Sequence, residues 1–231
     1  MKKEEKMRKK IVGFMIAGML ILVFGLASTP AKAELSLGLV GGYYSPNFGK
    51  INDDFDDMNA FLGTDFEFKA GMLYGLALDY GLPPRFTLRL EYCSFESKTS
   101  DDYWVGSSLF GTHWEDDYKL TVTPVIFSVL YSLSPAYVGV GLGSFPTKLK
   151  NDWEWEDYFL GFVVDSSSGS FSDSDTPTGF VLLGGFEFGG ESPFLDLEAR
   201  YVVGTKAKLE DWHTEVDLSG LQLSLLAGFK F

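Results

Sequence analysis

Cysteine, histidine and basic residues are scarce in this sequence of 231 residues, and each shortage restricts what the protein does. The single Cys93 cannot form an intrachain disulfide and has no neighbouring residues for a metal site, so we expect it to fill a small space in the core. Residues 34–231 carry 12 Lys and Arg against 30 Asp and Glu, a formal net charge of −18. This excess of acid argues against nucleic acid as a partner.

Long apolar runs are equally scarce, and the one present lies near the start. The apolar stretch 11–27 follows a basic segment and precedes Ala31-Lys32-Ala33, the arrangement of a secretory signal peptide. We expect cleavage after Ala33; an uncleaved membrane anchor is the alternative, because the run approaches the roughly 18 residues of a membrane helix. The sequence therefore predicts a signal peptide at 1–33 and a single domain at 34–231.

Eight later segments show the two-residue alternation or the composition of β-strands. Each is close to the length of about 9 to 11 residues that a tilted strand needs to cross a bilayer. They span residues 35–45, 71–81, 86–96, 118–131, 136–146, 177–188, 194–204 and 218–231.

The connections between these segments alternate strictly in length. Three are short and rich in turn residues, at 82–85, 132–135 and 189–193. Four are long, polar and acidic, at 46–70, 97–117, 147–176 and 205–217. The pattern predicts an all-β, eight-stranded antiparallel up-and-down transmembrane β-barrel with short periplasmic turns, long external loops and both termini in the periplasm.

The two faces of the predicted strands differ in polarity. Leu221, Leu223 and Leu225 share one face with Phe229 and Phe231, and charged residues occupy the other face of several strands. A soluble barrel would turn the apolar face inward, but aromatic residues near strand ends and long loops on one side only favour a membrane barrel. The expected lumen network comprises Asp79, Arg89, Glu91, Lys119, Glu187, Asp196, Glu198, Arg200 and Lys230, with Arg89 and Arg200 as its hubs.

The segment 118–131 departs from this alternation. Lys119, Thr121 and Thr123 share one phase, whereas the polar Ser128 falls in the other phase after Pro124. Proline cannot donate to a strand ladder and is often found at bulges, so we expect a β-bulge at Pro124 that restores the register.

The long connections contain three further patterns. Ile51, Phe55, Met58 and Leu62 have helical spacing, which predicts a short amphipathic helix that either caps the barrel or, as we prefer, only folds its loop on itself. The tryptophans fit adhesion or an interfacial belt equally well. The Ser-rich tract 165–175 is typical of a flexible loop tip. The tryptophans are Trp104, Trp114, Trp153, Trp155 and Trp212.

The chain resembles the small outer-membrane barrels of the OmpA, OmpX and OmpW type. The resemblance covers the eight-strand plan and the ending Ala227-Gly228-Phe229-Lys230-Phe231, in which Phe229 and Phe231 are similar to the signal read by the barrel assembly machinery. It implies a bacterial outer-membrane location after export, contact with outer-membrane lipid and lipopolysaccharide, and a monomer. Proteins with different functions share this architecture, so the resemblance predicts the fold better than the function.

Some barrels of this type modify lipid A, which makes an enzyme a possibility to test. Such deacylases carry a His-x-Ser pair, whereas His113 precedes Trp114-Glu115 and His213 precedes Thr214-Glu215. A nucleophile needs a base within hydrogen-bond reach, so we predict no enzyme, no cofactor and no catalytic residue. The acidic runs 53–57 and 115–117 lack the spacing of a calcium loop, and we expect solvated loops rather than a metal site.

These observations predict a non-enzymatic protein with a structural or surface-interaction role in the cell envelope. The alternative is a narrow, OmpW-like transporter of small hydrophobic molecules, for which the inward Val40, Val181 and Leu183 are the support. A lipid A-modifying enzyme ranks third. A continuous apolar cavity in the lumen would favour transport, and a salt-bridged plug would favour the structural role.

Overall fold

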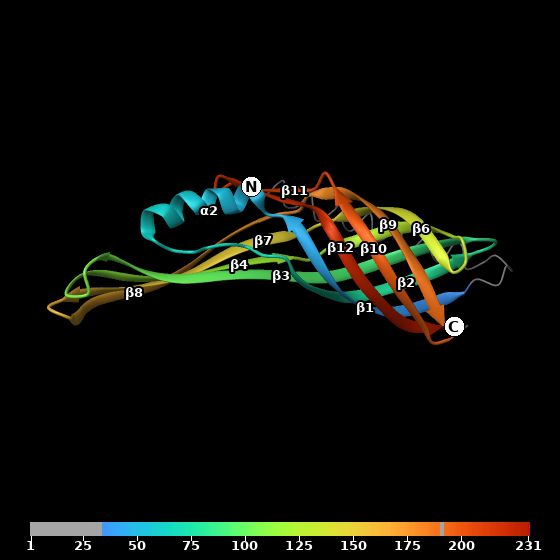
Figure 1. Cartoon of the computed structure of the whole chain (residues 1–231), viewed down its shortest axis with the longest axis horizontal. Coiled ribbons are helices and arrows are strands. Elements are labelled where there is room, and N and C mark those ends of the chain that lie inside the picture. The colour runs from blue at the N-terminus through green and yellow to red at the C-terminus, as the bar shows by residue number, and fades with distance from the viewer. Residues whose placement is uncertain (1–33, 190–191) are drawn as a thin grey trace, which may run out of the picture. The chain divides into compact units, whose positions relative to one another are not determined.

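The computed structural model describes residues 34–189 and 192–231 (Figure 1). The predicted signal peptide lies outside the described residues. Within these ranges no helix is long and apolar enough to cross a membrane.

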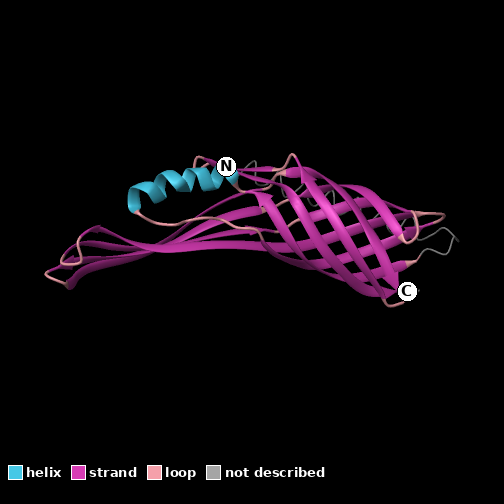
Figure 2. Cartoon of the chain, in the orientation of Figure 1, coloured by secondary structure: helices cyan, strands magenta, loops and turns pink. Residues whose placement is uncertain are grey.

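Eight antiparallel strands close into a barrel, which confirms the predicted fold class. Neighbouring strands pair in the order β2-β1-β12-β10-β9-β6-β5-β3, and a β2–β3 pairing closes the circle. The crossing strands of the barrel are seen in Figure 2, at the end of the molecule where the C-terminus lies. The barrel strands are β1 (Leu35–Asn47), β2 (Gly71–Leu82), β3 (Phe86–Gly106), β5 (Val125–Ser132), β6 (Ala136–Ser144), β9 (Thr178–Gly189), β10 (Phe194–Val203) and β12 (Thr214–Lys230).

The outside of this barrel is a continuous apolar belt. All eight strands contribute large apolar side chains that are exposed on the outer surface, whereas the alternate side chains are buried inside. A closed sheet with an apolar exterior suits lipid, because closure leaves no strand edge unpaired within the hydrocarbon. One such residue from each strand is Leu39, Leu76, Tyr92, Val129, Val140, Leu182, Leu197 and Leu223.

We expected the long connections to be irregular loops. Two of them are instead β-hairpins that extend the barrel wall. The prolonged β3 pairs with β4 (Phe110–Val122), β4 with β7 (Thr147–Phe159) and β7 with β8 (Phe162–Asp175). We call these four strands above the barrel the sheet extension; they run together to the far end of the unit (Figure 1). The prediction of a flexible tip at 165–175 was wrong, because β7 supplies a full ladder of backbone hydrogen bonds to this tract.

Three prolines mark the level at which the strands leave the barrel. Each interrupts one long strand and cannot donate to the ladder, but its carbonyl oxygen accepts a hydrogen bond from the neighbouring strand. The bonds run from Cys93 N–H to Pro124 O (3.0 Å), from Thr123 N–H to Pro146 O (2.9 Å) and from Phe145 N–H to Pro177 O (2.8 Å).

No bulge accompanies Pro124, so that prediction was wrong. The pairs Tyr92–Val125 and Phe95–Val122 on either side of it keep the same register. What changes at Pro124 is the medium outside the barrel wall. Below this level the apolar Val125 and Val129 are exposed to lipid, whereas above it the apolar Leu120 points inward and is buried. Polar residues face outward above the belt because water replaces lipid there.

A helix and a short segment fill the space enclosed by the sheet extension and β12. The helix α2 (Gly49–Leu62) buries Ile51 and Phe55, and the Phe55 ring lies 5.0 Å from that of Tyr118 on β4. Segment 64–70 then passes between α2 and β3. The helix therefore caps the barrel mouth, and the preferred interpretation, that it only folds its loop on itself, was wrong.

The fourth long connection forms a small addition to the barrel rim. Strand β11 (Lys206–Leu209) pairs with the extended start of β12. Backbone N–H groups of Lys208 and Asp211 donate to the side chains of Asp175 and Asp173, each at 2.9 Å. These bonds tie the rim to the base of β8.

Candidate functional site

A network of ion pairs crosses the barrel lumen. Arg89 donates to both carboxylate oxygens of Asp79 at 2.7 Å and to Glu198 at 2.7 Å. Arg200 donates to both oxygens of Glu91 at 2.7 Å and also contacts Glu198. Glu198 therefore joins the two guanidinium groups, each of which has at most 2% of its surface exposed.

Two further residues complete this network. Asp196 accepts a hydrogen bond from Arg89 at 3.2 Å, and Tyr137 donates to Glu198 at 2.9 Å. The contributing strands include β3 and β10, which stand on opposite sides of the barrel in the strand order. An eight-stranded barrel is only wide enough for its own side chains, so this arrangement is a salt-bridged plug.

The remaining predicted lumen residues lie at the barrel end or outside the lumen. Lys230 pairs with Glu187 at 2.5 Å near the strand ends, where Glu187 is 39% exposed. Lys119 does not belong to the lumen: it lies on the outer face of β4, 41% exposed, and pairs with Glu96. The prediction placed it inside because it assumed lipid outside the whole strand, whereas residue 119 lies above the apolar belt.

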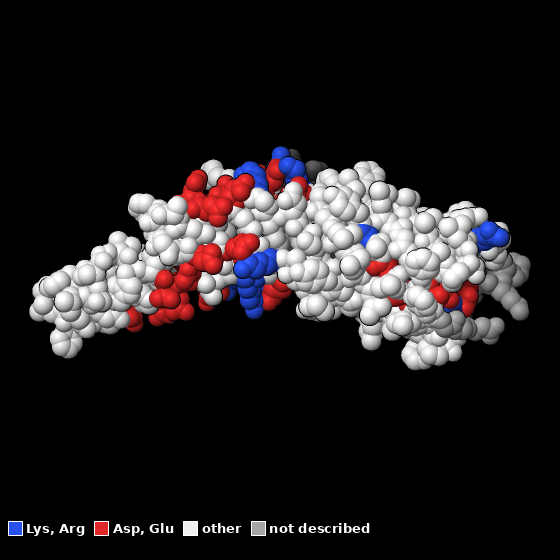
Figure 3. All heavy atoms as spheres, viewed as in Figure 1, with Lys and Arg blue, Asp and Glu red and all other residues white. Residues whose placement is uncertain are grey.

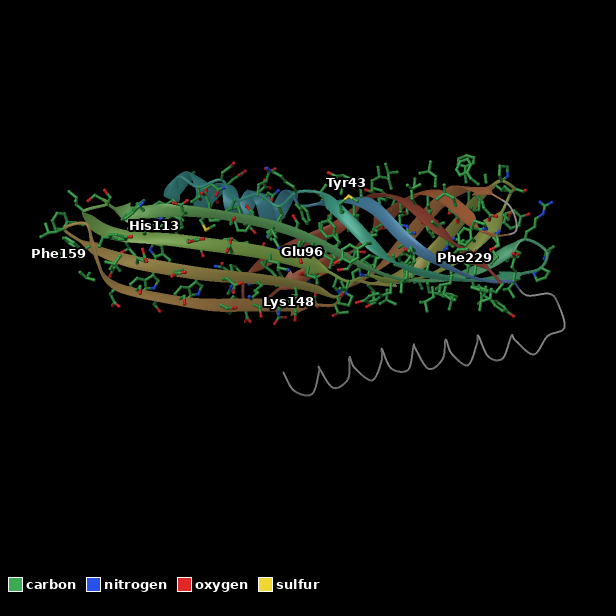
Figure 4. All side chains as sticks on the ribbon, turned by 90° about the horizontal axis from the view of Figure 1, so that it is seen from below. Tyr43, Glu96, His113, Lys148, Phe159 and Phe229 are labelled. Carbon is green, nitrogen blue, oxygen red and sulfur yellow. The ribbon has the colours of Figure 1, made fainter. Side chains whose placement is uncertain are left out.

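Lysines gather on the outer face just above the belt. Lys98, Lys119 and Lys150 stand directly opposite one another on β3, β4 and β7, and the exposed Lys148 lies two residues below Lys150. Two carboxylates, Glu96 and Asp152, offset part of this charge. In Figure 3 a group of basic side chains lies between the mostly uncharged surface of the barrel and the acidic part of the extension, and Figure 4 labels Glu96 and Lys148 there.

Above this lysine row the outer face of the sheet extension is acidic. Like charges stand directly opposite one another in the pairs Asp102–Glu115, Glu115–Glu154 and Asp117–Asp152. Such pairs destabilise a sheet. A shallow cleft of about 400 Å³ lies beside them, lined in part by Ser168 and Ser170 of β8.

The inner face of the extension carries most of the tryptophans. The rings of Trp153 and Trp155 lie 6.3 Å and 6.2 Å from Trp114, which stacks at 6.4 Å on Tyr103. Trp212 instead packs against Tyr118 in the capped core. All these rings lie above the apolar belt, so they do not form an interfacial belt around it.

A buried carboxylate holds the inner face together. Asp116 accepts hydrogen bonds from Asn151 at 2.8 Å and from the Tyr103 hydroxyl at 3.2 Å. Burial, followed by the nearby charge of Asp116, raises the pKa of Tyr103 to about 12. The tyrosine therefore remains a neutral donor throughout the physiological range.

The histidines and acidic runs lie apart from this plug. His113 pairs with Asp102 at 3.1 Å on the exposed sheet, and the carboxylates of α2 line its solvent-exposed face. No group of three or more His, Cys, Asp or Glu in the described ranges is arranged to hold a metal ion. Cys93 is buried beside Glu91, with its Sγ 3.4 Å from a carboxylate oxygen.

Sequence reasoning missed the residues that seat the cap. Asn52 and Asn59 of α2 each bond the backbone of segment 64–70 through both amide atoms, at 2.9 Å and 3.0 Å. From the other side Ser97 and Thr99 of β3 accept its N–H groups. Asparagine at positions i and i+7 on the inner side of the predicted helix was the available signal.

No protein-family model matches this sequence, and the search of the curated proteins found no match. Among solved structures, the chain is similar to Ail, the attachment invasion locus protein of Yersinia pestis, in complex with the heparin analogue sucrose octasulfate (14% identity, 86% of this chain and 97% of that chain, TM-score 0.40). It is also similar to the outer membrane protein OprG from Pseudomonas aeruginosa (14% identity, 86% and 95%, TM-score 0.42). Neisserial surface protein A shares 12% identity over 86% of this chain and 94% of that chain, with a TM-score of 0.28.

The geometry itself defines the class of protein. The chain forms a closed eight-stranded barrel with an apolar belt, tight turns at one end and the water-exposed sheet extension at the other. These are the features of a bacterial outer-membrane β-barrel. The chain is therefore a small barrel of the outer membrane.

Proposed function

We propose that the protein is a non-enzymatic surface-interaction protein, anchored by its barrel and acting through the sheet extension. The observation that carries this proposal is the contrast between the two halves of the unit. Ion pairs with buried guanidinium groups cross the lumen, whereas the extension carries acidic side chains on its outer face and aromatic side chains on its inner face. A filled barrel supplies rigidity, and a projecting sheet supplies contact area.

A shortened variant tests this proposal. Ser100, Asp117, Asp152 and Ser170 form one row across the extension, so residues 101–116 and 153–169 can be replaced by short Gly-containing turns above it. The barrel belt and the lumen network remain intact in this variant. We expect heat-modifiable gel mobility as in the wild type, but loss of attachment of expressing bacteria to host cells or extracellular matrix.

Two results would count against the proposal. The first is that the shortened variant attaches as well as the wild type. The second is that the wild-type protein gives steady conductance in planar bilayers and the shortened variant retains it. The second result would favour the transporter. Its support is limited to the buried Val40, Val181 and Leu183, because the aromatic rings of Phe48, Phe68 and Phe95 pack together above them.

The remaining partners follow from the same placement. We propose that lipopolysaccharide surrounds the belt, that the barrel assembly machinery recognises the exposed Phe229 and Phe231, and that the barrel is a monomer, since closure leaves no edge within the belt. Sedimentation in detergent at several protein concentrations tests the monomer. A mass that rises with concentration would contradict it.

A further inference from the structure

The far end of the sheet extension is an exposed apolar tip. It consists of the ends of the β3–β4 and β7–β8 hairpins, where large apolar side chains keep between 49 and 74% of their surface exposed. In Figure 3 this end is uncharged, and Figure 4 labels Phe159 there. The tip residues are Val105, Leu109, Phe110, Phe159, Leu160, Phe162, Val163 and Val164.

The tip is apolar on both faces of the sheet. Phe162 and Val163 are consecutive residues of β8 that pair with Phe159 and Tyr158, so their side chains point to opposite sides of the sheet, and both are exposed. Phe110 packs edge-to-face on Phe159 at 5.5 Å and joins the two hairpins into one unit. A partner docking on one face would leave the other face in water, whereas a lipid phase covers both.

The charges around the tip select the kind of lipid. Residues 103–112 and 158–164 contain no Asp, Glu, Lys or Arg. The first charges below the tip are the acidic Asp102, Glu156, Asp157 and Asp165. An anionic lipid surface would repel this acidic collar, whereas a zwitterionic surface would not.

We propose that this tip inserts into a second, zwitterionic lipid bilayer that faces the outer membrane holding the barrel. Large exposed apolar patches mark interaction or membrane sites, and aromatic residues on a hairpin end suit the interface of a bilayer. The inference rests on the proposed surface-interaction function and names its partner as the lipid itself.

Vesicle flotation tests the inference with the full-length protein, its belt covered by a nanodisc. Phosphatidylcholine vesicles without protein are the probe. The test variant carries two substitutions, Phe159→Ser and Phe162→Ser. We expect the wild type to float with the vesicles and the double variant to bind roughly tenfold or more weakly, since each phenyl group removed is apolar surface withdrawn from lipid. Replacing half of the lipid by phosphatidylglycerol should weaken wild-type binding.

The matched control is Phe61→Ser on α2, because Phe61 is 88% exposed but lies away from the tip. It should bind like the wild type. Equal loss with this control, binding only to anionic vesicles, or tip-dependent dimers in the absence of vesicles would overturn the inference. If vesicles do not bind but bacterial attachment still depends on the extension, the lipid inference fails and the proposed function stands.

Discussion

Arg200 on β10 and Glu91 on β3 join opposite walls of the barrel through two parallel hydrogen bonds of 2.7 Å. Both side chains are almost completely buried. A guanidinium and a carboxylate in this geometry form one of the strongest charge-assisted contacts in proteins. Because 109 residues separate the two in sequence, the contact exists only in the closed barrel.

Removing one member of this pair should be costly. Arg200→Met leaves the buried carboxylate of Glu91 without its ion-pair partner, and Glu198 keeps only Arg89 and Tyr137 as partners. We expect the free energy of unfolding to fall by about 3–5 kcal/mol. Urea unfolding in lipid vesicles, followed by tryptophan fluorescence, measures it. Lys230→Met is the control, because its partner Glu187 is partly exposed, and should cost about 1 kcal/mol or less. Equal losses would contradict a buried plug.

The cap should depend on the two asparagines of α2. Asn52→Ala leaves the backbone N–H and C=O of Phe68 without their partners, at a cost of about 1–3 kcal/mol for each buried group. We expect faster proteolysis and faster hydrogen exchange between residues 49 and 69, with the barrel itself unchanged. Asp53→Ala on the solvent face of the same helix is the control. The cap is seated differently if both variants behave alike.

The lysine row should bind the phosphate groups of lipopolysaccharide. Changing Lys98, Lys119, Lys148 and Lys150 to Gln removes four positive charges, of which Glu96 and Asp152 offset two. Each basic residue near an anionic surface contributes about 1 kcal/mol, so the loss of the two charges that are not offset alone should make binding roughly thirtyfold weaker and less salt-sensitive. Binding of the detergent-solubilised protein to immobilised lipopolysaccharide is the measurement. Arg85→Gln, in a turn at the opposite end, should bind as the wild type does.

Alkaline pH should loosen the sheet extension. The pKa of Tyr103 is raised to about 12, so the folded state retains a proton that the unfolded chain loses at about pH 10. Its contribution to stability is complete below pH 10 and is lost as pH rises to 12. The difference in tyrosinate absorbance between the wild type and Tyr103→Phe isolates this residue. A midpoint near 10 would show that Asp116 and burial have no effect on it.

The barrel was predictable because its rules are local. Apolar side chains alternate along each strand, and tight turns such as Leu82-Pro83-Pro84-Arg85 alternate with long connections. Lipid requires a closed sheet, so these patterns alone determine the strand number and which face turns inward. Arg89 and Arg200 fall on the inward face for the same reason.

Only the tertiary structure decided what the charged residues contact and what the long connections become. The Ser-rich tract 165–175 has weak local preferences, and it is a strand because β7 offers it backbone partners. Lys119 has the alternation of a lumen residue, but it lies above Pro124, where water replaces lipid and the polar face turns outward. Sequence determines the alternation of a strand, and the level of each residue relative to the membrane determines what that alternation means.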